Sequence, residues 1–478
     1  MAATVLTARD LHLLHRWMGI GLGLVVLIWF VSGVVMLFVS RPALEESERL
    51  QALPELGPTA AFAAPLAAWQ SLGLTGWPED VRLNAANGQP AYHFLAEGKW
   101  SSVRAADGMP LSATSASQSV DTARKLVPDG NVVAVTAIDT DQWTVYRSFD
   151  AWRPFLRVEF DNGGQIYISS RTGEAVLDTN KWERLGNWLG SVVHWVYFVP
   201  IRQHAQLWRS TVLVLSFLAL LLAVSGLWLG FQRLRVVRRY KEGRISPYRE
   251  GLKKWHHLLG IAGGGFVVSW LLSGWLSMSP LGLAAGVVPS QQDHLGFAGG
   301  PLSADVLGLE ANWQQGTREI EWLRIGGEGV MRQRGAEEEN RLTWQDGRHM
   351  SSLSLEMIAR SAAQLRAGTA YSAEWLHAPD RRYYPLRHHQ KPFPVARISF
   401  EDERNSVFYI DPEAASITML SDRTDAAHRW LFLALHRLDF PLLVASPLVR
   451  DILVIAFSML GGAVVMAGCI LGWRRLGK

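Results

Sequence analysis

Cysteine is almost absent, because the 478-residue chain contains only Cys469, which lies inside a long apolar run. A single thiol excludes intrachain disulfides, thiolate metal clusters, Cys-x-x-Cys redox chemistry and covalent c-type haem attachment. Nucleotide-binding signatures are missing as well, since no predicted strand precedes a Rossmann or P-loop fingerprint. Any redox centre must therefore be held by histidine or brought by a partner, and its electrons must come from quinol or a separate reductase.

Charged residues are missing from four apolar stretches of more than twenty residues, at 17–40, 210–231, 258–289 and 452–473. Each stretch is long enough to cross a hydrocarbon layer of about 30 Å as a helix. We therefore expect four helices in a lipid bilayer, with the end of the third stretch emerging from it. No span carries a charged residue at its middle, which disfavours a transporter pathway.

Basic residues gather on one side of this arrangement. The connection 233–254 carries nine Lys or Arg residues against two Glu, and both chain ends are basic. By the positive-inside rule this side faces the cytoplasm, so both termini are cytoplasmic and the two long connections lie outside. The net charge of +4 reflects this topology and does not indicate nucleic-acid binding.

The outer segments of the two halves share one pattern: strand, Asp-Gly turn, strand, short helix and a second hairpin. The hairpin patterns lie at 99–112 and 155–176 in the first half, and at 340–354 and 395–417 in the second. We therefore expect an internal two-fold repeat of helix, small α+β domain, interfacial segment and helix. Such symmetry often places a site at the interface between repeats.

The fold class that follows is an α-helical membrane protein with four transmembrane helices and two outer α+β domains. The expected order is a first helix with a cytoplasmic start (1–40), an outer domain with its interfacial segment (41–208), a second helix (209–232), a basic loop (233–254), a third helix (255–289), a second outer domain with its interfacial segment (290–450) and a fourth helix with a cytoplasmic tail (451–478).

These features resemble the PepSY-associated transmembrane family. The likeness rests on "LHRWMGIGLG" at 14–23, on "YISSRTGEAV" at 167–176 before a Trp-rich segment with a histidine, and on four spans that enclose two outer domains. It covers essentially the whole chain, although the second half has "PEAAS" at 412–416 in place of "RTGE". The resemblance implies a bacterial inner-membrane protein with PepSY-like periplasmic domains. Characterised members include haem-containing reductases that release iron from ferric siderophores in the periplasm.

Fourteen histidines are too many to assign by residue type, but alignment of the halves retains two matched pairs. His15 aligns with His256, and His194 aligns with His436. Each pair meets at one membrane boundary, because helices one and three run in the same direction, as do helices two and four. Opposed imidazoles from facing helices suit a b-type haem, so with the resemblance we expect two haems b. Snorkelling to lipid headgroups is the alternative.

Other candidate residues depend on this arrangement. His257 remains an alternative to His256, because adjacent helical residues point about 100° apart. Arg209 and Arg450 open the second and fourth spans, where a guanidinium can bind haem propionates or anchor a helix at the interface. His388 and His389 occur only in the second half. They are candidates for contacting the electron acceptor, with a solvated loop as the alternative.

We therefore expect a transmembrane electron-transfer protein, a haem-dependent oxidoreductase that reduces a periplasmic acceptor. The resemblance implies that this acceptor is a ferric siderophore or another ferric chelate. The alternative is a non-redox membrane protein whose PepSY-like domains bind or regulate a periplasmic peptide or protease. The two hypotheses predict different absorption spectra for the purified protein, since only the first requires a haem spectrum.

Overall fold

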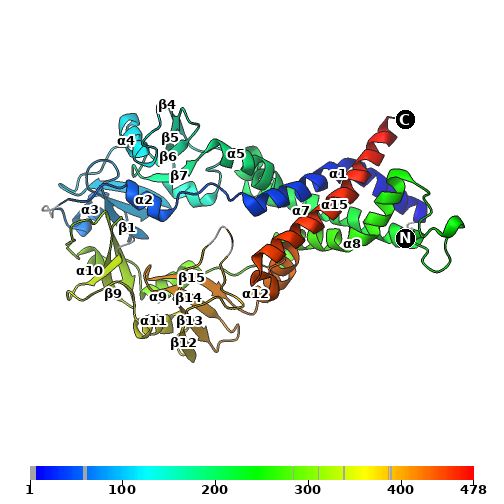
Figure 1. Ribbon diagram of the computed structural model, residues 1–478. Helices are drawn as coiled ribbons and strands as arrows, with labels where there is room; N and C mark the ends of the chain where they lie inside the picture. Colours follow the sequence, from blue (N-terminus) through cyan, green and yellow to red (C-terminus); the bar gives the residue numbers. More distant parts are fainter. Residues whose placement is uncertain are drawn as a thin grey trace, which may run out of the picture. The chain divides into compact units, whose positions relative to one another are not determined.

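The computed structural model describes residues 7–57, 62–283, 285–310, 312–336, 340–385, 387 and 390–477. The chain folds into two compact units (Figure 1). The membrane unit comprises Met1–Arg41, Leu185–Gly286 and Thr424–Lys478, and the sheet unit comprises Pro42–Arg184 and Val287–Arg423. Each unit is therefore assembled from both halves of the chain.

Four long apolar helices form the membrane unit, which confirms the predicted spans. Among the described residues, the helices long and apolar enough to cross a membrane are α1 (Ala8–Phe38), α7 (Ala205–Arg233), α8 (Gly251–Ser277) and α15 (Pro447–Leu476). Helices α1 and α8 each pack against both α7 and α15, so they face each other across the bundle. Large apolar side chains on the outer faces, such as Leu24 and Val214, are more than half exposed. This is typical of helices that are surrounded by lipid.

Local chemistry decides where the spans begin and end. Thr7 and Asp10 form a capping box at the start of α1. Helix α8 ends at Ser277 although its apolar run continues, because Pro280 has no N–H to donate. Ser279 and Leu281 adopt φ values of 48° and 54° there, which breaks the helical path. The third apolar run thus continues beyond the end of its helix.

Short helical segments lead into α7 and α15. In the first half they are α5 (Lys181–Asn187), the π-helical turn η2 (Trp188–Val192) and α6 (Val199–Arg202). In the second half they are α12 (Asp425–His428), the π-helical turn η6 (Arg429–Ala434), α13 (Leu435–Arg437) and α14 (Pro441–Val444). We predicted one interfacial segment after each outer α+β domain, within 41–208 and within 290–450. From residues 185 and 424 onward they belong to the membrane unit.

The sheet unit contains two four-stranded antiparallel sheets, one from each half. The first consists of β4 (Val132–Ile138), β5 (Phe155–Phe160), β6 (Gln165–Ser169) and β7 (Ala175–Thr179), and the second of β12 (Tyr371–Leu376), β13 (Val395–Phe400), β14 (Val407–Asp411) and β15 (Ser416–Ser421). Helix α4 (Ala116–Leu126) packs on the first sheet and α11 (Leu355–Ala362) on the second. These elements confirm the predicted second hairpins and the helices before them.

A third sheet is shared by both halves, with strand order β11-β10-β9-β8-β1-β2-β3. Its strands are β1 (Asp80–Asn84), β2 (Ala91–Ala96), β3 (Lys99–Arg104), β8 (Glu319–Ile325), β9 (Glu328–Arg334), β10 (Asn340–Trp344) and β11 (His349–Met350). Strand β1 pairs antiparallel with β8, with Leu83 opposite Ile320. We predicted two outer domains. The structure joins them, because β1 and β8 satisfy each other's main-chain groups at what would otherwise be two sheet edges.

Other short elements complete the sheet unit. They are α2 (Glu46–Ala52), α3 (Pro65–Ser71), α9 (Gln291–Ala298) and α10 (Ala304–Leu307). The predicted hairpin at 99–112 keeps its first strand, but its second strand is reduced to one bridge between Val103 and Pro110. Because Pro110 has no N–H, it cannot extend that ladder.

A buried ionic network lies at the joint between β1 and β8. The Glu174 and Glu319 side chains are fully buried, and Arg49 donates to Glu174 at 3.1 Å and to Glu319 at 2.7 Å. Asn84 of β1 donates to both carboxylates at 3.0 Å, and Arg334 donates to Glu319. Glu174 belongs to the "RTGE" turn, so this motif ties the first four-stranded sheet to the shared sheet.

Candidate functional site

Two histidine pairs lie inside the membrane unit. His15 is on α1 and His256 is on α8, and the centroids of their rings are 6.3 Å apart with an interplanar angle of 37°. His194 and His436 form the second pair, with ring centroids also 6.3 Å apart and an interplanar angle of 68°. The structure therefore brings together the pairs that the alignment of the two halves predicted.

Backbone carbonyls orient the first pair. Nδ1 of His15 donates to the carbonyl oxygen of Leu222 at 3.1 Å and lies 3.2 Å from Oγ of Ser225. Nδ1 of His256 donates to the carbonyl oxygen of Val464 at 3.0 Å. Since a carbonyl oxygen can only accept, the proton of each neutral ring is on Nδ1. Nε2 of either ring has no hydrogen-bond partner among the described residues, and its lone pair is available for a ligand.

Serines orient the second pair. Oγ of Ser32 donates to the carbonyl oxygen of Trp29 at 3.2 Å and accepts from Nδ1 of His194 at 3.0 Å. In the other half, Oγ of Ser273 donates to the carbonyl oxygen of Trp270 at 3.0 Å and lies 3.1 Å from Nδ1 of His436. The same Trp270 oxygen accepts from this Nδ1 at 3.2 Å. All four histidines thus have Nδ1 bound to the protein.

Unusual backbone geometry presents the second pair. A π-helical turn comes shortly before each histidine, η2 before His194 and η6 before His436. Two residues after each histidine, Val196 and Leu438 both have φ of 55°. The left-handed region is rare for branched residues, and such strain gathers at functional sites. Both halves therefore use the same local arrangement to turn a histidine toward the bundle.

A glycine lies against each of the four rings. A Cβ added at Gly226 would lie 2.5 Å from Cε1 of His15, and one added at Gly468 would lie 3.1 Å from Cε1 of His256. A Cβ added at Gly33 would lie 3.6 Å from Cε1 of His194, and one added at Gly274 would lie 3.2 Å from Cε1 of His436. Larger residues at Gly226 or Gly468 would push the rings out of place. Of these residues, Gly226, Gly468, Ser32 and Ser273 were not predicted as site residues, although Ser32-Gly33 and Ser273-Gly274 occupy matching positions in the two halves.

The remaining glycines of the spans have other roles. A Cβ at Gly23 would lie 2.8 Å from Sγ of Cys469, and one at Gly264 would lie 2.7 Å from the side chain of Leu227. These positions allow close helix packing. By contrast, a Cβ on Gly21 or Gly265 would meet nothing within 4 Å.

The spacing within each pair suits two imidazoles that share one metal ion. A metal–imidazole bond is about 2.0–2.1 Å long, and a ring nitrogen lies roughly 1.2 Å from the centre of its ring. Two opposed imidazoles on one ion therefore have ring centroids roughly 6.5 Å apart. Both pairs have 6.3 Å. In the described part of the chain, no three His, Cys, Asp or Glu side chains gather as a metal site.

The two pairs lie at opposite ends of the bundle. His15 and Ser32, which contacts the second pair, are both on α1 and are 17 residues apart. His256 and Ser273 have the same spacing on α8. At 1.5 Å per residue, this spacing is about 25 Å along each helix. The pairs are therefore separated by most of a hydrocarbon layer of about 30 Å.

The structure distinguishes His256 from His257. His257 is buried, with Nδ1 2.9 Å from Oγ of Ser246 and Nε2 3.0 Å from the carbonyl oxygen of Gly230. Both of its nitrogens are therefore engaged, and it anchors the basic loop 233–254 to α7. His256 is the one that faces His15.

Arg209 and Arg450 have partners within the protein. The guanidinium of Arg209 donates to the carbonyl oxygens of Met278 and Ser279 at 3.1 and 2.8 Å, where it caps the end of α8. Arg450 is buried and forms ion pairs with Asp439 at 3.1 Å and with Asp451 at 3.4 Å. Arg209 thus stabilises the end of α8, and Arg450 holds the start of α15 against the segment that contains Asp439. The predicted His388 and His389 lie outside the described residues.

Comparison with known families identifies the family of this chain. The model of the PepSY-associated TM region matches residues 12–312. The chain belongs to the PepSY-associated transmembrane family. The match to this PepSY-associated region includes His15, His194 and His256, whereas His436 lies beyond it. No curated protein matches the chain. Membership of the PepSY-associated family agrees with the four membrane helices and with the sheet-containing unit of this chain.

Proposed function

We propose that this protein is a b-type cytochrome that carries electrons across the bacterial inner membrane to a periplasmic ferric chelate. The observation that supports it most is the pair of matched sites, each with two imidazole rings 6.3 Å apart. His15 and His256 would hold one haem b, and His194 and His436 the other. Bound haem would supply reversible one-electron chemistry at iron.

The protein's own residues would perform three tasks. The carbonyl oxygens of Leu222 and Val464 keep the Nδ1 protons of the first pair in place, so that Nε2 is available. Ser32 and Ser273 do the same for the second pair. Hydrogen bonds of this kind orient metal-ligating histidines and adjust their basicity. Between the pairs, a buried cluster with Phe30, Val267 and other apolar side chains excludes water.

The direction of electron flow follows from the proposed topology. The basic loop 233–254 and the two chain ends would lie in the cytoplasm. The sheet unit would then be periplasmic, where there is room to bind an acceptor. A ferric siderophore or another ferric chelate is proposed because haem-containing relatives of the family act on such compounds. Quinol or a separate cytoplasmic reductase would supply the electrons.

An absorption spectrum tests the proposal directly. Purified protein should show a Soret band and an α-band that appears on reduction, with about two haems per chain by pyridine haemochrome assay. Protein that is intact and colourless after expression with a haem supply would contradict the proposal. It would favour the alternative of a non-redox protein that binds or regulates a periplasmic peptide or protease.

Replacing Gly226 by alanine should remove the haem of the first pair. The new Cβ would lie 2.5 Å from Cε1 of His15, so the ring must move and its nitrogen with it. Haem content should fall from about two to about one per chain. Gly21→Ala is the matched control on α1, because its Cβ meets nothing within 4 Å. Equal haem content in both variants would show that Gly226 does not set the ring position.

Reporter fusions test the topology. Fusions at residues 242 and 478 should behave as cytoplasmic, and fusions near residues 120 and 370 as periplasmic, because the Lys/Arg bias lies on the inner connections. Paired alkaline phosphatase and fluorescent-protein reporters measure this at each position. A periplasmic signal at residue 242 would contradict the proposed topology and the direction of electron flow that follows from it.

A further inference from the structure

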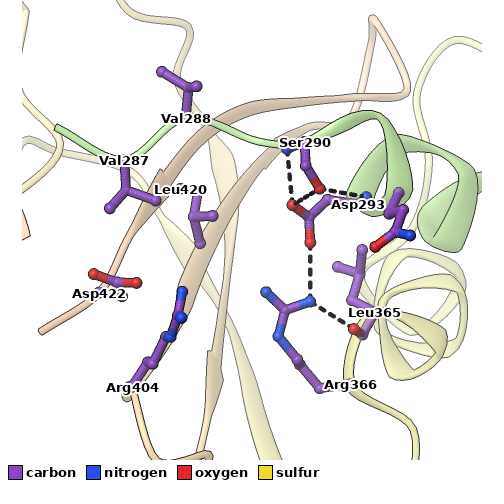
Figure 2. A pocket seen from close by; sticks show the side chains of 10 residues that line it. Val287, Val288, Ser290, Asp293, Leu365, Arg366, Arg404, Leu420 and Asp422 are labelled. Atoms are coloured by element: carbon purple, nitrogen blue, oxygen red, sulfur yellow. Dashed lines mark hydrogen bonds and ion pairs between the residues drawn. The ribbon is translucent and has the colours of Figure 1, made fainter. Parts of the chain in front are cut away.

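The sheet unit contains a recess that none of the predicted sites includes (Figure 2). Its volume is about 410 Å³, near the lower end of the range for ligand pockets. It is lined by Val287 and Val288 of the segment before α9, the start of α9, the short helix after α11, the β13–β14 turn and the end of β15. All of these segments come from the second half of the chain and from one unit.

Arg366 is held firmly at one side of this recess. Its Nη1 donates to Oδ1 of Asp293 at 2.9 Å, its Nε lies 3.4 Å from Asp402, and its guanidinium stacks on Phe408 at 5.1 Å from the ring centroid. Asp293 also caps α9 by accepting from Ser290. Nη2 of Arg366 has no hydrogen-bond partner among the described residues and is available to a ligand.

Arg404 differs from Arg366 because no described residue is a partner for its charge. It projects from the β13–β14 turn, and its backbone is fixed by Arg423, whose N–H donates to the Arg404 carbonyl oxygen at 2.8 Å. In the part of the chain that the structure describes, its guanidinium makes no ion pair or hydrogen bond. Figure 2 shows this side chain reaching up beside Leu420, toward the recess. Asp422 is nearly buried and is engaged within the protein. Among the residues that line the recess, the exposed charge is therefore that of Arg404.

We propose that this recess binds a small polycarboxylate chelate of iron, of the hydroxycarboxylate class. A guanidinium matches a carboxylate with two parallel hydrogen bonds. Arg404 provides one such fork, and the free Nη2 of Arg366 adds a contact through a single nitrogen from a different segment. Val287 and Leu420 provide an apolar wall for the carbon skeleton. The small volume favours a compact chelate over a large siderophore. This inference rests on the proposed function and names its substrate class.

Binding of gallium citrate to the full-length protein in detergent tests the recess. Gallium(III) replaces iron(III) without being reduced, so titration calorimetry measures binding separately from electron transfer. Arg404→Ala should weaken binding at least tenfold, and Arg404→Lys should bind with intermediate affinity because the charge remains but the planar fork is lost. Arg360→Ala is the control, since Arg360 is an exposed arginine of α11 outside the recess. It should bind like the parent protein.

The outcomes separate this inference from the proposed function. No binding of gallium citrate, or an affinity of Arg404→Ala within twofold of the parent, would overturn the recess as the chelate site, even if the haem spectrum and reduction of other chelates were normal. Normal gallium citrate binding by protein without a Soret band would leave the recess in place and contradict the cytochrome. Tenfold weaker binding with an unchanged spectrum supports the site.

Discussion

His256→Ala is expected to lower the haem content from about two to about one per chain, whereas His257→Ala should leave both haems in place. The reason is that Nε2 of His256 has no hydrogen-bond partner among the described residues, and the centroid of its ring lies 6.3 Å from that of His15. Both nitrogens of His257 are bound to Ser246 and Gly230. Pyridine haemochrome assays and reduced-minus-oxidised spectra measure this difference.

Further variants test the pairing itself. His15→Ala should also remove one haem, and the double variant of His15 and His256 should lose no more than either single variant, because both imidazoles serve one iron. His194→Ala and His436→Ala should behave likewise for the second haem. Free imidazole should partly restore the spectrum of His256→Gly, since it can occupy the vacated position. Haem loss in His257→Ala with a normal His256→Ala would mean that the two adjacent residues have exchanged roles.

Glu319→Gln is expected to destabilise the sheet unit by about 3–5 kcal/mol. The carboxylate of Glu319 is fully buried and accepts from Arg49, Arg334 and Asn84 at the joint between β1 and β8. The amide cannot compensate the buried guanidinium charges, so Arg49 would keep only Glu46 and Glu174 as ionic partners, and Arg334 only Glu46 and Glu321. The loss of this compensation costs more than the lost hydrogen bonds. Hydrogen-exchange mass spectrometry of peptides from β1 and β8 in the full chain measures the local free energy of opening.

The effect of Glu319→Gln should depend on pH. Burial by itself would raise the pKa of Glu319, but the charges and hydrogen bonds of Arg49 and Arg334 outweigh it and hold the pKa well below its ordinary value. The carboxylate therefore stabilises the fold fully above its unfolded-state pKa of about 4.3, and this contribution is lost as the pH falls toward the folded-state value. The difference between parent and variant should narrow below about pH 4.3.

An exposed ion pair provides the control for this prediction. Glu356 and Arg360 lie one helical turn apart on α11, 3.7 Å from each other, with side chains 85% and 73% exposed. Glu356→Gln should change stability by no more than about 0.5 kcal/mol, because solvent screens such pairs. A loss below about 1 kcal/mol in Glu319→Gln would show that the joint between β1 and β8 does not depend on its ionic network.

Features encoded locally were predictable from the sequence. The four spans follow from uncharged apolar runs, and the hairpin from β5 to β6 follows from alternating residues around a turn. The pairing of β1 with β8 was not predictable in this way. The two strands are more than 200 residues apart, and either could have remained a sheet edge without changing its own pattern.

The four histidines also illustrate which features the sequence predicts and which require the structure. Comparison of the two halves within one sequence selected His15, His194, His256 and His436, because side chains that a shared geometry requires recur at matching positions. The choice of His256 over His257 depended on this alignment alone, although one residue along a helix rotates the side chain by about 100°. Only the packed bundle shows that His257 is occupied by Ser246 and Gly230.

By itself, the sequence determined the membrane spans, the order of elements and the matched histidines, because hydropathy, turn chemistry and internal repetition are properties of short segments. Only the tertiary structure determined which distant residues of the chain contact each other. It joined the two outer segments through β1 and β8, placed Asp439 against Arg450, and set Gly226 against the His15 ring. Contacts between distant residues depend on how the helices and strands pack, and that packing is determined by the whole chain at once.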